Sequence, residues 1–405
     1  MTDNSNIVKI DALGETKLFQ PIKLGANTLS QRIAHAPTTR LRATEDNVPT
    51  DLQLEYYRDR AQAPGTLLIT EATYVSEGGI GLPHTPGLWN DTQAKAWKKI
   101  TQAIREQGSF SSVQLWHLGR TAFPEELKKR GLPFVAPSAL YDSEEMEKRA
   151  KACGHELRAL TKSEIEQLIN EDFPNAARKA LAAGFDYVEL HSAHGYLLSQ
   201  FLNPVSNQRT DEYGGSIENR ARLLLAIVDK LIPIVGANRL GIRFSPWATF
   251  QVSKPEGAEI HSYILQELQK RADDGNELAY VSLVEPRVSG IVDVSAEDIH
   301  GSNDFVSKIW KGSLIKAGNY TYNAPKFTEL VRDIDNDRTL VAWCRFFTSN
   351  PDLVARLQNG YPLQHYDRDT FYQPYNWGYN TWNKYDETKE YDEEAEKKRV
   401  GKALA

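Results

Sequence analysis

Residues 185–196 read FDYVELHSAHGY, and this stretch decides the fold. Its first half, Phe185–Leu190, is short, largely apolar and rich in β-forming residues, which predicts a buried strand. Its second half places His191, His194 and Tyr196 where that strand ends. Ligands of parallel α/β proteins bind at the carboxyl ends of the strands. The stretch therefore predicts such a fold, with a ligand site that contains two imidazoles and a phenol.

Strand and helix patterns alternate eight times along the chain. The strands are nearly continuous apolar runs, as expected where both faces of a sheet are covered. Eight alternating units are the number that closes a TIM (β/α)8 barrel, so we predict this α/β architecture. The predicted strands are Arg32–Pro37, Thr66–Thr73, Ser111–Leu118, Tyr187–His191, Arg239–Ser245, Leu278–Glu285, Ser313–Gly318 and Thr339–Phe346. The predicted helices are Gln53–Ala61, Thr92–Glu106, Lys162–Ala183, Ile217–Val235, Glu259–Asp273, Asp304–Lys311, Pro325–Asp333 and Pro351–Asn359.

Three further segments complete a single predicted domain over residues 1–405. A short N-terminal hairpin, Phe19–Ile22 with Thr28–Leu29, precedes the first strand and is expected to plug the barrel floor. Pro124–Ala150 is too long for an ordinary βα loop and predicts a lid inserted after strand three. Residues 373–405 form a charged C-terminal extension, in which residues 393–399 predict a solvent-exposed helix.

Composition narrows the classes of function. The net charge of −6 and the absence of a clustered basic face argue against a nucleic-acid partner. No apolar run approaches the length of about 18 residues that a membrane span needs, and the polar N-terminus lacks a signal-peptide core. Only two cysteines occur, Cys153 and Cys344, without metal-ligand spacing. We therefore expect a cytoplasmic protein in a reducing compartment.

Strand parity predicts which side chains meet. Gln114 and Trp116 are two residues apart and share a face, as do Glu189 and His191. His194 lies three residues beyond His191 and would point away in an extended strand. We expect a turn near residue 193, allowed by the following glycine, that brings both imidazoles to one site.

A set of motifs in every unit resembles one known family. The motifs are Thr39-Arg40, Ile69-Thr70-Glu71, Gln114-Leu115-Trp116, His191–Leu198, Gln200–Leu202, Arg209–Ser216, Arg243, Glu285-Pro286-Arg287, Ala317-Gly318-Asn319, Arg345-Phe346-Phe347, Asn350–Leu353 and Asp367–Tyr372. In this order they resemble the Old Yellow Enzyme family, flavin-dependent ene-reductases built on a TIM barrel. The resemblance runs from about Leu18 to Tyr372 and suggests a fungal-like member.

The resemblance implies tightly bound, non-covalent FMN across the top of the barrel. Arg345 would pair with its phosphate, where a guanidinium fork fits the oxygens. Arg243 would face the flavin N1–O2 edge, where negative charge gathers on reduction. Thr39 would bond the flavin O4, and Gln114 would read the pyrimidine edge. The other implied FMN contacts are Pro37, Thr38, Ala72, His191, Gly318, Asn319 and Cys344.

The resemblance also implies a substrate site and a reaction. His191 and His194 would bind the carbonyl or nitro oxygen of an activated alkene, and Tyr196 would protonate its α-carbon after hydride reaches the β-carbon. Trp116 and Tyr372 would contact the substrate. NADPH or NADH would reduce the flavin from the same site, since the chain has no GxGxxG fingerprint. The implied small-molecule partners are enones, enals, nitroalkenes and phenolic inhibitors, bound by a monomer or homodimer.

Two departures distinguish this chain from the founding yeast members. Position 194 is histidine rather than asparagine, as in many bacterial relatives. Ala342 and Cys344 stand where those members carry glycines, and a Cβ there is expected to narrow the approach of the backbone to the phosphate.

Other interpretations of these residues remain open at this point. A metal-dependent barrel hydrolase could use Glu189, His191 and His194, although no further ligands complete a set at other strand ends. A non-catalytic binder of phenols or steroids could hold flavin without turnover, but it would not need Tyr196. Structural roles are also available: an ion pair of Arg243 with Glu189, barrel filling by Trp116, aromatic packing by Tyr196 and a small buried hydrophobe at Cys344.

Overall fold

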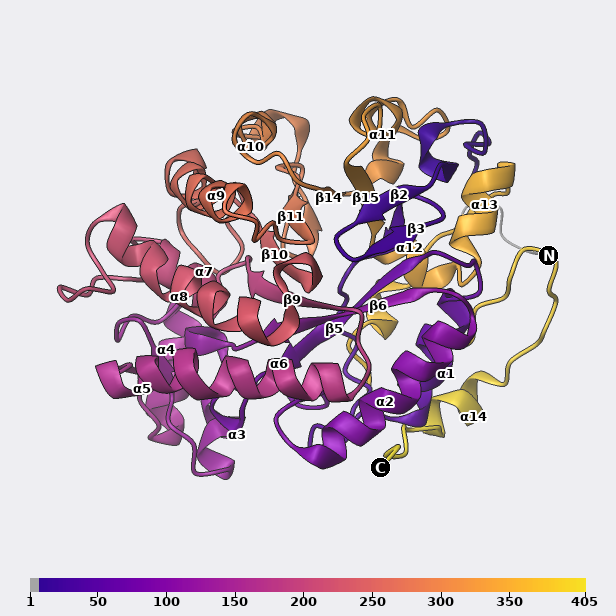
Figure 1. Ribbon diagram of the computed structural model, residues 1–405. Coiled ribbons are helices and arrows are strands. Elements are labelled where there is room, and N and C mark those ends of the chain that lie inside the picture. The colour runs from indigo at the N-terminus through magenta and orange to yellow at the C-terminus, as the bar shows by residue number, and fades with distance from the viewer. Residues whose placement is uncertain (1–6) are drawn as a thin grey trace.

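The computed structural model describes residues 7–405 and contains a closed barrel of eight parallel strands (Figure 1). Each strand pairs with the next along the chain, and the eighth pairs with the first. The predicted TIM barrel is confirmed. Its strands are β4 (Ile33–His35), β5 (Leu67–Tyr74), β6 (Phe110–Trp116), β9 (Tyr187–Ser192), β10 (Leu240–Phe244), β11 (Tyr280–Val284), β14 (Leu314–Ala317) and β15 (Thr339–Trp343).

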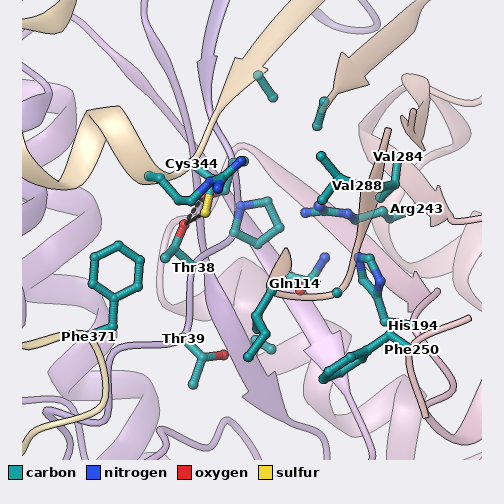
Figure 2. Close-up of a pocket in the computed structure, with 18 of the residues that line it drawn as sticks. Thr38, Thr39, Gln114, His194, Arg243, Phe250, Val284, Val288, Cys344 and Phe371 are labelled. Atoms are coloured by element: carbon teal, nitrogen blue, oxygen red, sulfur yellow. Dashed lines mark hydrogen bonds between the residues drawn. The ribbon is translucent and has the colours of Figure 1, made fainter. Parts of the chain in front are cut away.

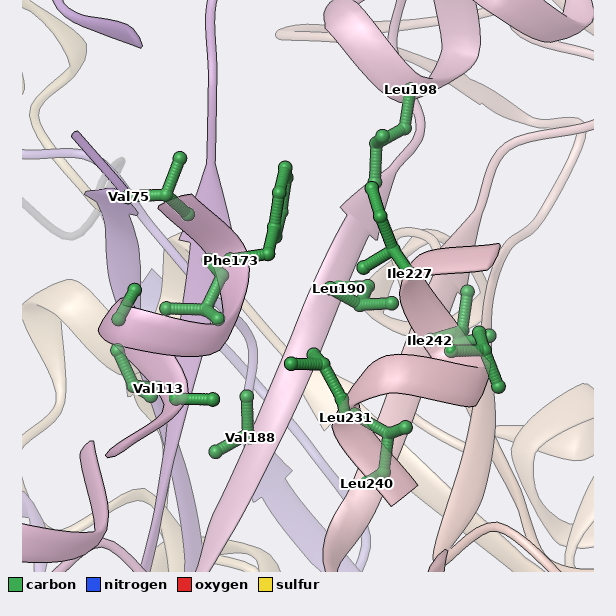
Figure 3. Packing of buried hydrophobic residues seen from close by; sticks show 14 of the residues in the cluster. Val75, Val113, Phe173, Val188, Leu190, Leu198, Ile227, Leu231, Leu240 and Ile242 are labelled. Atoms are coloured by element: carbon green, nitrogen blue, oxygen red, sulfur yellow. The ribbon is translucent and has the colours of Figure 1, made fainter. Parts of the chain in front are cut away.

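Helices surround the barrel and bury its outer face. Outward side chains of the strands, such as Val188, Leu190 and Ile242, pack against Ile227 and Leu231 of α8 (Figure 3). The outward face of these strands is therefore apolar, as expected for a parallel sheet that helices cover. The surrounding helices are α1 (Asp51–Arg60), α2 (Asp91–Glu106), α6 (Phe173–Ala182), α8 (Ile217–Val235), α9 (Ala258–Asp273), α10 (Asp304–Ile309), α11 (Thr328–Asp333) and α13 (Leu353–Asn359).

The predicted helix Lys162–Ala183 is interrupted in the structure. It consists of α5 (Lys162–Gln167), a π-helical turn over Leu168–Asp172, and α6. Pro174 lies in the first turn of α6 and has no N–H to donate to the preceding turn. The wider π turn accommodates this missing donor, which periodicity alone does not predict.

The N-terminal hairpin closes the floor of the barrel, as predicted. It pairs β2 (Ile22–Leu24) with β3 (Asn27–Leu29). The Tyr187 hydroxyl, at the start of β9, donates to the Leu24 carbonyl at 2.7 Å. The Ala26 N–H donates to the carbonyl of Asn238, just before β10, at 3.0 Å. The hairpin therefore seals the amino ends of the strands and leaves the carboxyl ends for a site.

The insertion expected over Pro124–Ala150 follows β6, the third strand of the barrel. It contains α3 (Pro124–Lys129), β7 (Val135–Ala136) and α4 (Glu144–Cys153). Its apolar side chains pack in one cluster with Trp116 at the end of β6. In the described chain, no residue of Pro124–Ala150 lines the cavity, although the preceding Phe123 does. The apolar side chains of the insertion are thus buried against the carboxyl ends of β5 and β6.

The C-terminal extension returns to the first βα unit. The short helix α14 (Glu393–Lys398) has no buried residue, as predicted for an exposed helix. Beyond it, Ala403 forms an antiparallel bridge with Thr50, and the Leu404 N–H donates to the Pro49 carbonyl at 3.0 Å. Residues 400–404 therefore fasten the loop between β4 and α1 (Figure 1, yellow). Within residues 7–405, no helix combines the length and the apolar character that crossing a bilayer requires.

Candidate active site

One layer of side chains at the carboxyl end of the barrel forms the floor of the site. Strand register aligns Tyr74 with Trp116, and Arg243 with His191. The Tyr74 and Trp116 rings stack at 5.2 Å, and the Trp116 and His191 rings lie 6.2 Å apart with 16° between their planes. Pairing of parallel strands thus places an aromatic row and a guanidinium around one opening.

A left-handed turn brings the second histidine back to this layer. His194 has φ 57° and Gly195 has φ 72°, which reverses the chain after β9. The His194 N–H donates to Ser245 Oγ at 2.8 Å, which fixes the turn to the end of β10. The His191 and His194 rings consequently lie 6.1 Å apart, nearly perpendicular. The predicted turn is confirmed, and His194 takes part in it as well as the glycine.

A cavity of about 490 Å³ opens above this layer. Every residue that the sequence predicted for the site lines it, including Thr39, Gln114, Tyr196, Arg345 and Tyr372. Figure 2 shows Gln114 and Arg243 on their strands and His194 in the turn after β9, all beside the cavity. The remaining predicted residues on its wall are Pro37, Thr38, Ala72, Trp116, His191, Gly318, Asn319 and Cys344.

Both imidazoles are held in the neutral form. Burial lowers the pKa of His194 to about 3, and Arg243 adds to this effect. Burial also lowers the pKa of His191 well below its usual range, with His194 and Arg243 acting in the same direction. Nδ1 of each ring is buried without a hydrogen-bond partner among the described residues. Two neutral rings with uncommitted nitrogens suit hydrogen bonding to a ligand oxygen.

The proton of Tyr196 is retained across the neutral range. Burial raises the pKa of Tyr196, and Tyr372 adds to this, while a side-chain hydrogen bond with Gln251 opposes it. The Tyr196 ring lies 4.9 Å from the His191 ring and 4.7 Å from the Trp116 ring, edge-on to both. The hydroxyl therefore belongs to the same wall as the two imidazoles.

Arg243 is a buried cation that keeps donors free. Burial lowers its pKa, whereas Glu189 opposes this electrostatically. Gln114 Nε2 already donates to Glu189 Oε1 at 2.7 Å. Arg243 Nε has no hydrogen-bond partner in residues 7–405. An unsatisfied buried donor is costly, so Arg243 is suited to bind an anionic group in the cavity.

Arg345 lies at the other end of the cavity in an ion pair. Its Nη1 donates to Asp293 Oδ2 and to the Tyr366 hydroxyl, each at 2.9 Å. Beside it, Cys344 Sγ lies 2.9 Å from Thr38 Oγ1 (Figure 2). Gly318 and Asn319, with φ 153° and 46°, form the adjoining loop after β14. This end combines a guanidinium with a tight backbone turn.

These donors fit FMN, the cofactor that the sequence resemblance implies. The uncommitted Arg243 suits an anionic flavin edge, and Arg345 with the loop at Gly318 suits a phosphate. The side chains at Ala342 and Cys344 occupy the cavity wall without closing it. Among the described residues, no three His, Cys, Asp or Glu side chains gather as a metal centre would require.

Several residues of the cavity wall gave no signal in the sequence. Phe250 lies in the loop after β10, with its ring 6.3 Å from His194. Ile291 comes from a small hairpin, β12 (Val288–Ser289) and β13 (Val292–Asp293). Leu82 and Phe123 also line the wall. All four lie in irregular segments, where no period marks which side chains point inward.

Comparison with known proteins identifies the family. Residues 17–364 match the model of the NADH:flavin oxidoreductase / NADH oxidase family. A probable NADPH dehydrogenase of Candida albicans is 61% identical, over 99% of this chain and 97% of that protein. Enoate reductase 1 of Kluyveromyces lactis is 44% identical, over 93% of this chain and 96% of that protein.

Solved structures agree with this assignment. The crystal structure of Old Yellow Enzyme from Pichia sp. AKU4542 superposes with a TM-score of 0.90 at 46% identity, covering 97% of this chain and all of that chain (100%). Morphinone reductase superposes with a TM-score of 0.78 at 35% identity, covering 93% and 98%. The chain is therefore a fungal-like member of the NADH:flavin oxidoreductase / NADH oxidase family, an enzyme of the Old Yellow Enzyme type that uses FMN as cofactor and NADPH or NADH as co-substrate.

Proposed function

We propose that this enzyme reduces the C=C bond of α,β-unsaturated carbonyl and nitro compounds. The observation that carries the proposal is the shared wall of His191, His194 and Tyr196, two neutral donors and a protonated phenol around one cavity. The enoate reductase among its relatives supports the same class of reaction. Enones, enals and nitroalkenes are the proposed substrates.

His191 and His194 bind the oxygen of the substrate in this proposal. Each neutral imidazole has one N–H, and two such donors polarise the conjugated system toward that oxygen. The low pKa values matter, because a protonated ring would bring an uncompensated charge into a buried site. The same pair would bind a phenolate oxygen, so phenols are the proposed inhibitors.

Tyr196 supplies the proton. When bound and reduced, FMN supplies a hydride to the β-carbon. The Tyr196 O–H bond breaks as a C–H bond forms at the α-carbon, and solvent later returns a proton to the phenolate. A phenol can act as the acid here because its raised pKa keeps it protonated at neutral pH.

The rest of the wall would hold the cofactor and shape the site. Arg243, Thr39 and Gln114 would contact the flavin ring, with Pro37, Thr38 and Ala72 beside it. Arg345 would hold the phosphate, together with backbone at Gly318, Asn319 and Cys344. Trp116 and Tyr372 would flank the substrate, and the nicotinamide would use the same place in alternation with it.

An anaerobic experiment separates the two half-reactions. NADPH is expected to bleach the visible band of the bound flavin, and cyclohexenone to restore it without oxygen. Tyr196→Phe is expected to slow the second step by about 10²–10⁴-fold and to leave the first unchanged. Unchanged reoxidation in Tyr196→Phe would remove this tyrosine from the reaction.

A further inference from the structure

The loop after β10 reaches across the turn that carries the catalytic groups. A Cβ placed on Gly195 would lie 3.0 Å from Gln251 Cβ and 3.0 Å from the Phe250 carbonyl oxygen. Only a residue without a side chain lets the loop approach so closely. Residues 250–252 are therefore packed directly against the turn between His194 and Tyr196.

The backbone at Gln251 is held in a conformation that this residue seldom adopts. Its φ is 63°, in the left-handed region that favours glycine. The Gln251 carbonyl accepts a hydrogen bond from Arg120 Nη2 at 3.0 Å. Arg120 is buried, and its own N–H donates to Gln200 Oε1 at 3.1 Å. The surroundings thus maintain a strained backbone, which is common at functional positions.

The far end of the loop is fastened to the helix α7 (Leu197–Leu202) that follows Tyr196. Ser199 Oγ accepts from the Gly195 N–H at 3.1 Å and donates to Glu256. Asn203 Nδ2, just after α7, donates to the Lys254 carbonyl at 2.9 Å. The loop and the turn therefore behave as one fixed unit.

The side chain of Gln251 leaves the backbone directly beside Gly195, the residue before Tyr196. Its Oε1 is buried with no hydrogen-bond partner among the described residues. Its hydrogen bond with the phenol lowers the pKa of Tyr196, against the larger effect of burial. A hydrogen bond lowers the pKa of a phenol when it stabilises the charged form, the phenolate.

We propose that Gln251 is a positioning residue for proton transfer, holding the Tyr196 hydroxyl toward the substrate and donating an amide N–H to the phenolate as it forms. The inference rests on the proposed function, in which the Tyr196 proton moves to the α-carbon. The amide gives up no proton in this step. It provides a donor where negative charge develops, in a buried place where water cannot do so.

Gln251→Leu tests the proposal, because leucine keeps the bulk of the side chain and removes both amide groups. Reoxidation of the flavin by cyclohexenone is expected to slow about tenfold, the usual effect of one hydrogen bond. Reduction by NADPH is expected to be unchanged. Gln266→Leu, at an exposed position of α9, is the matched control and is expected to behave like the parent enzyme. Phenol binding and flavin content, both measured spectroscopically, report whether the site is intact.

A double-variant comparison makes the test specific. If Gln251 acts through Tyr196, then Gln251→Leu slows reoxidation in the parent enzyme and has no further effect in Tyr196→Phe. Equal slowing in both backgrounds, or no slowing in either, would overturn the inference. A fast Tyr196→Phe enzyme would instead refute the proposed function, so the two failures are distinguishable.

Discussion

Asp293 is paired with Arg345, the arginine expected to hold the phosphate of the cofactor. Two hydrogen bonds join the carboxylate to the guanidinium, and the one from Nη1 to Oδ2 is 2.9 Å long. Asp293 lies on β13, and Ile291 of the same hairpin lines the cavity. A phosphate and this carboxylate would therefore compete for one cation, and their competition would move the hairpin.

Asp293→Asn is expected to tighten FMN binding. The variant removes the competing charge, and the Asp293 side chain is 44% exposed, so we expect only a twofold to fivefold effect, about 0.5–1 kcal/mol. Quenching of FMN fluorescence by the deflavinated protein gives the affinity. Asp298→Asn, an exposed position on the same loop, is the control. Weaker binding in Asp293→Asn would show that the carboxylate orients Arg345 rather than competing for it.

His194→Ala is expected to weaken phenol binding. The variant removes one of two donors to a phenolate oxygen, and a hydrogen bond to a charged group contributes about 1.5–3 kcal/mol. The affinity is therefore expected to fall by about 10–100-fold, as measured by the long-wavelength absorbance of the flavin–phenol complex. His300→Ala, at an exposed position, serves as the control. An unaltered phenol affinity would remove His194 from the proposed donor pair.

His117 is expected to make folding sensitive to acid. Burial lowers the pKa of His117 to about 3, whereas an unfolded histidine titrates near 6.5. Between these values the unfolded chain binds the extra proton, so this contribution to stability declines as the pH falls below about 6.5. Glu71 has the opposite effect on stability as the pH falls, because burial raises its pKa to about 7. The contribution of His117 must therefore be measured as a difference between the parent enzyme and a variant.

His117→Gln isolates this contribution, since His117 does not line the cavity. We expect the Tm of the variant to fall less than that of the parent enzyme between pH 7 and pH 5. At pH 5.5 the corresponding difference in the pH-dependent loss of unfolding free energy is about 1–2 kcal/mol. If the Tm of both proteins changed equally with pH, the His117 ring would have the same protonation state in the folded and the unfolded chain.

The barrel and most of the site follow from local sequence. Strands such as Tyr187–Ser192 are buried on both faces, and Gly195 marks the turn that returns His194 to the site. The pair of Asp293 and Arg345 could not be predicted in this way. It joins positions 52 residues apart, and its hairpin has strands of two residues with no detectable period. Gln251 was missed for the same reason, because an irregular loop carries it.

The packing partner of the insertion could not be predicted for a different reason. Its length predicted a cover for the site, but length does not specify which neighbour buries an apolar face. Leu127, Phe134 and Met146 of the insertion pack in the cluster around Trp116. Only the packing of the folded chain decides between covering a site and supporting its wall.

Gly401→Val is expected to destabilise the protein through the first βα unit. A Cβ on Gly401 would collide with Thr50 Oγ1, and overpacking of this kind costs about 1–3 kcal/mol. The Tm is expected to fall. Flavin release is expected to begin at a lower temperature, because the loop that residues 400–404 fasten also carries Thr39 of the cavity wall. Lys398→Ala, at an exposed position of α14, is the control. An unchanged Tm in Gly401→Val would mean that the tail is not fixed to Thr50.

The attachment of residues 400–404 to Thr50 has a consequence for biosynthesis. While the ribosome is still translating the later units, β4 and α1 have emerged without the segment that ties them together. The barrel cannot close before β15 has been made, because β15 pairs with β4. The attachment of the first βα unit comes later still, about 350 residues after Thr50, at roughly 5–20 residues per second. Flavin capture during synthesis would then be a late event.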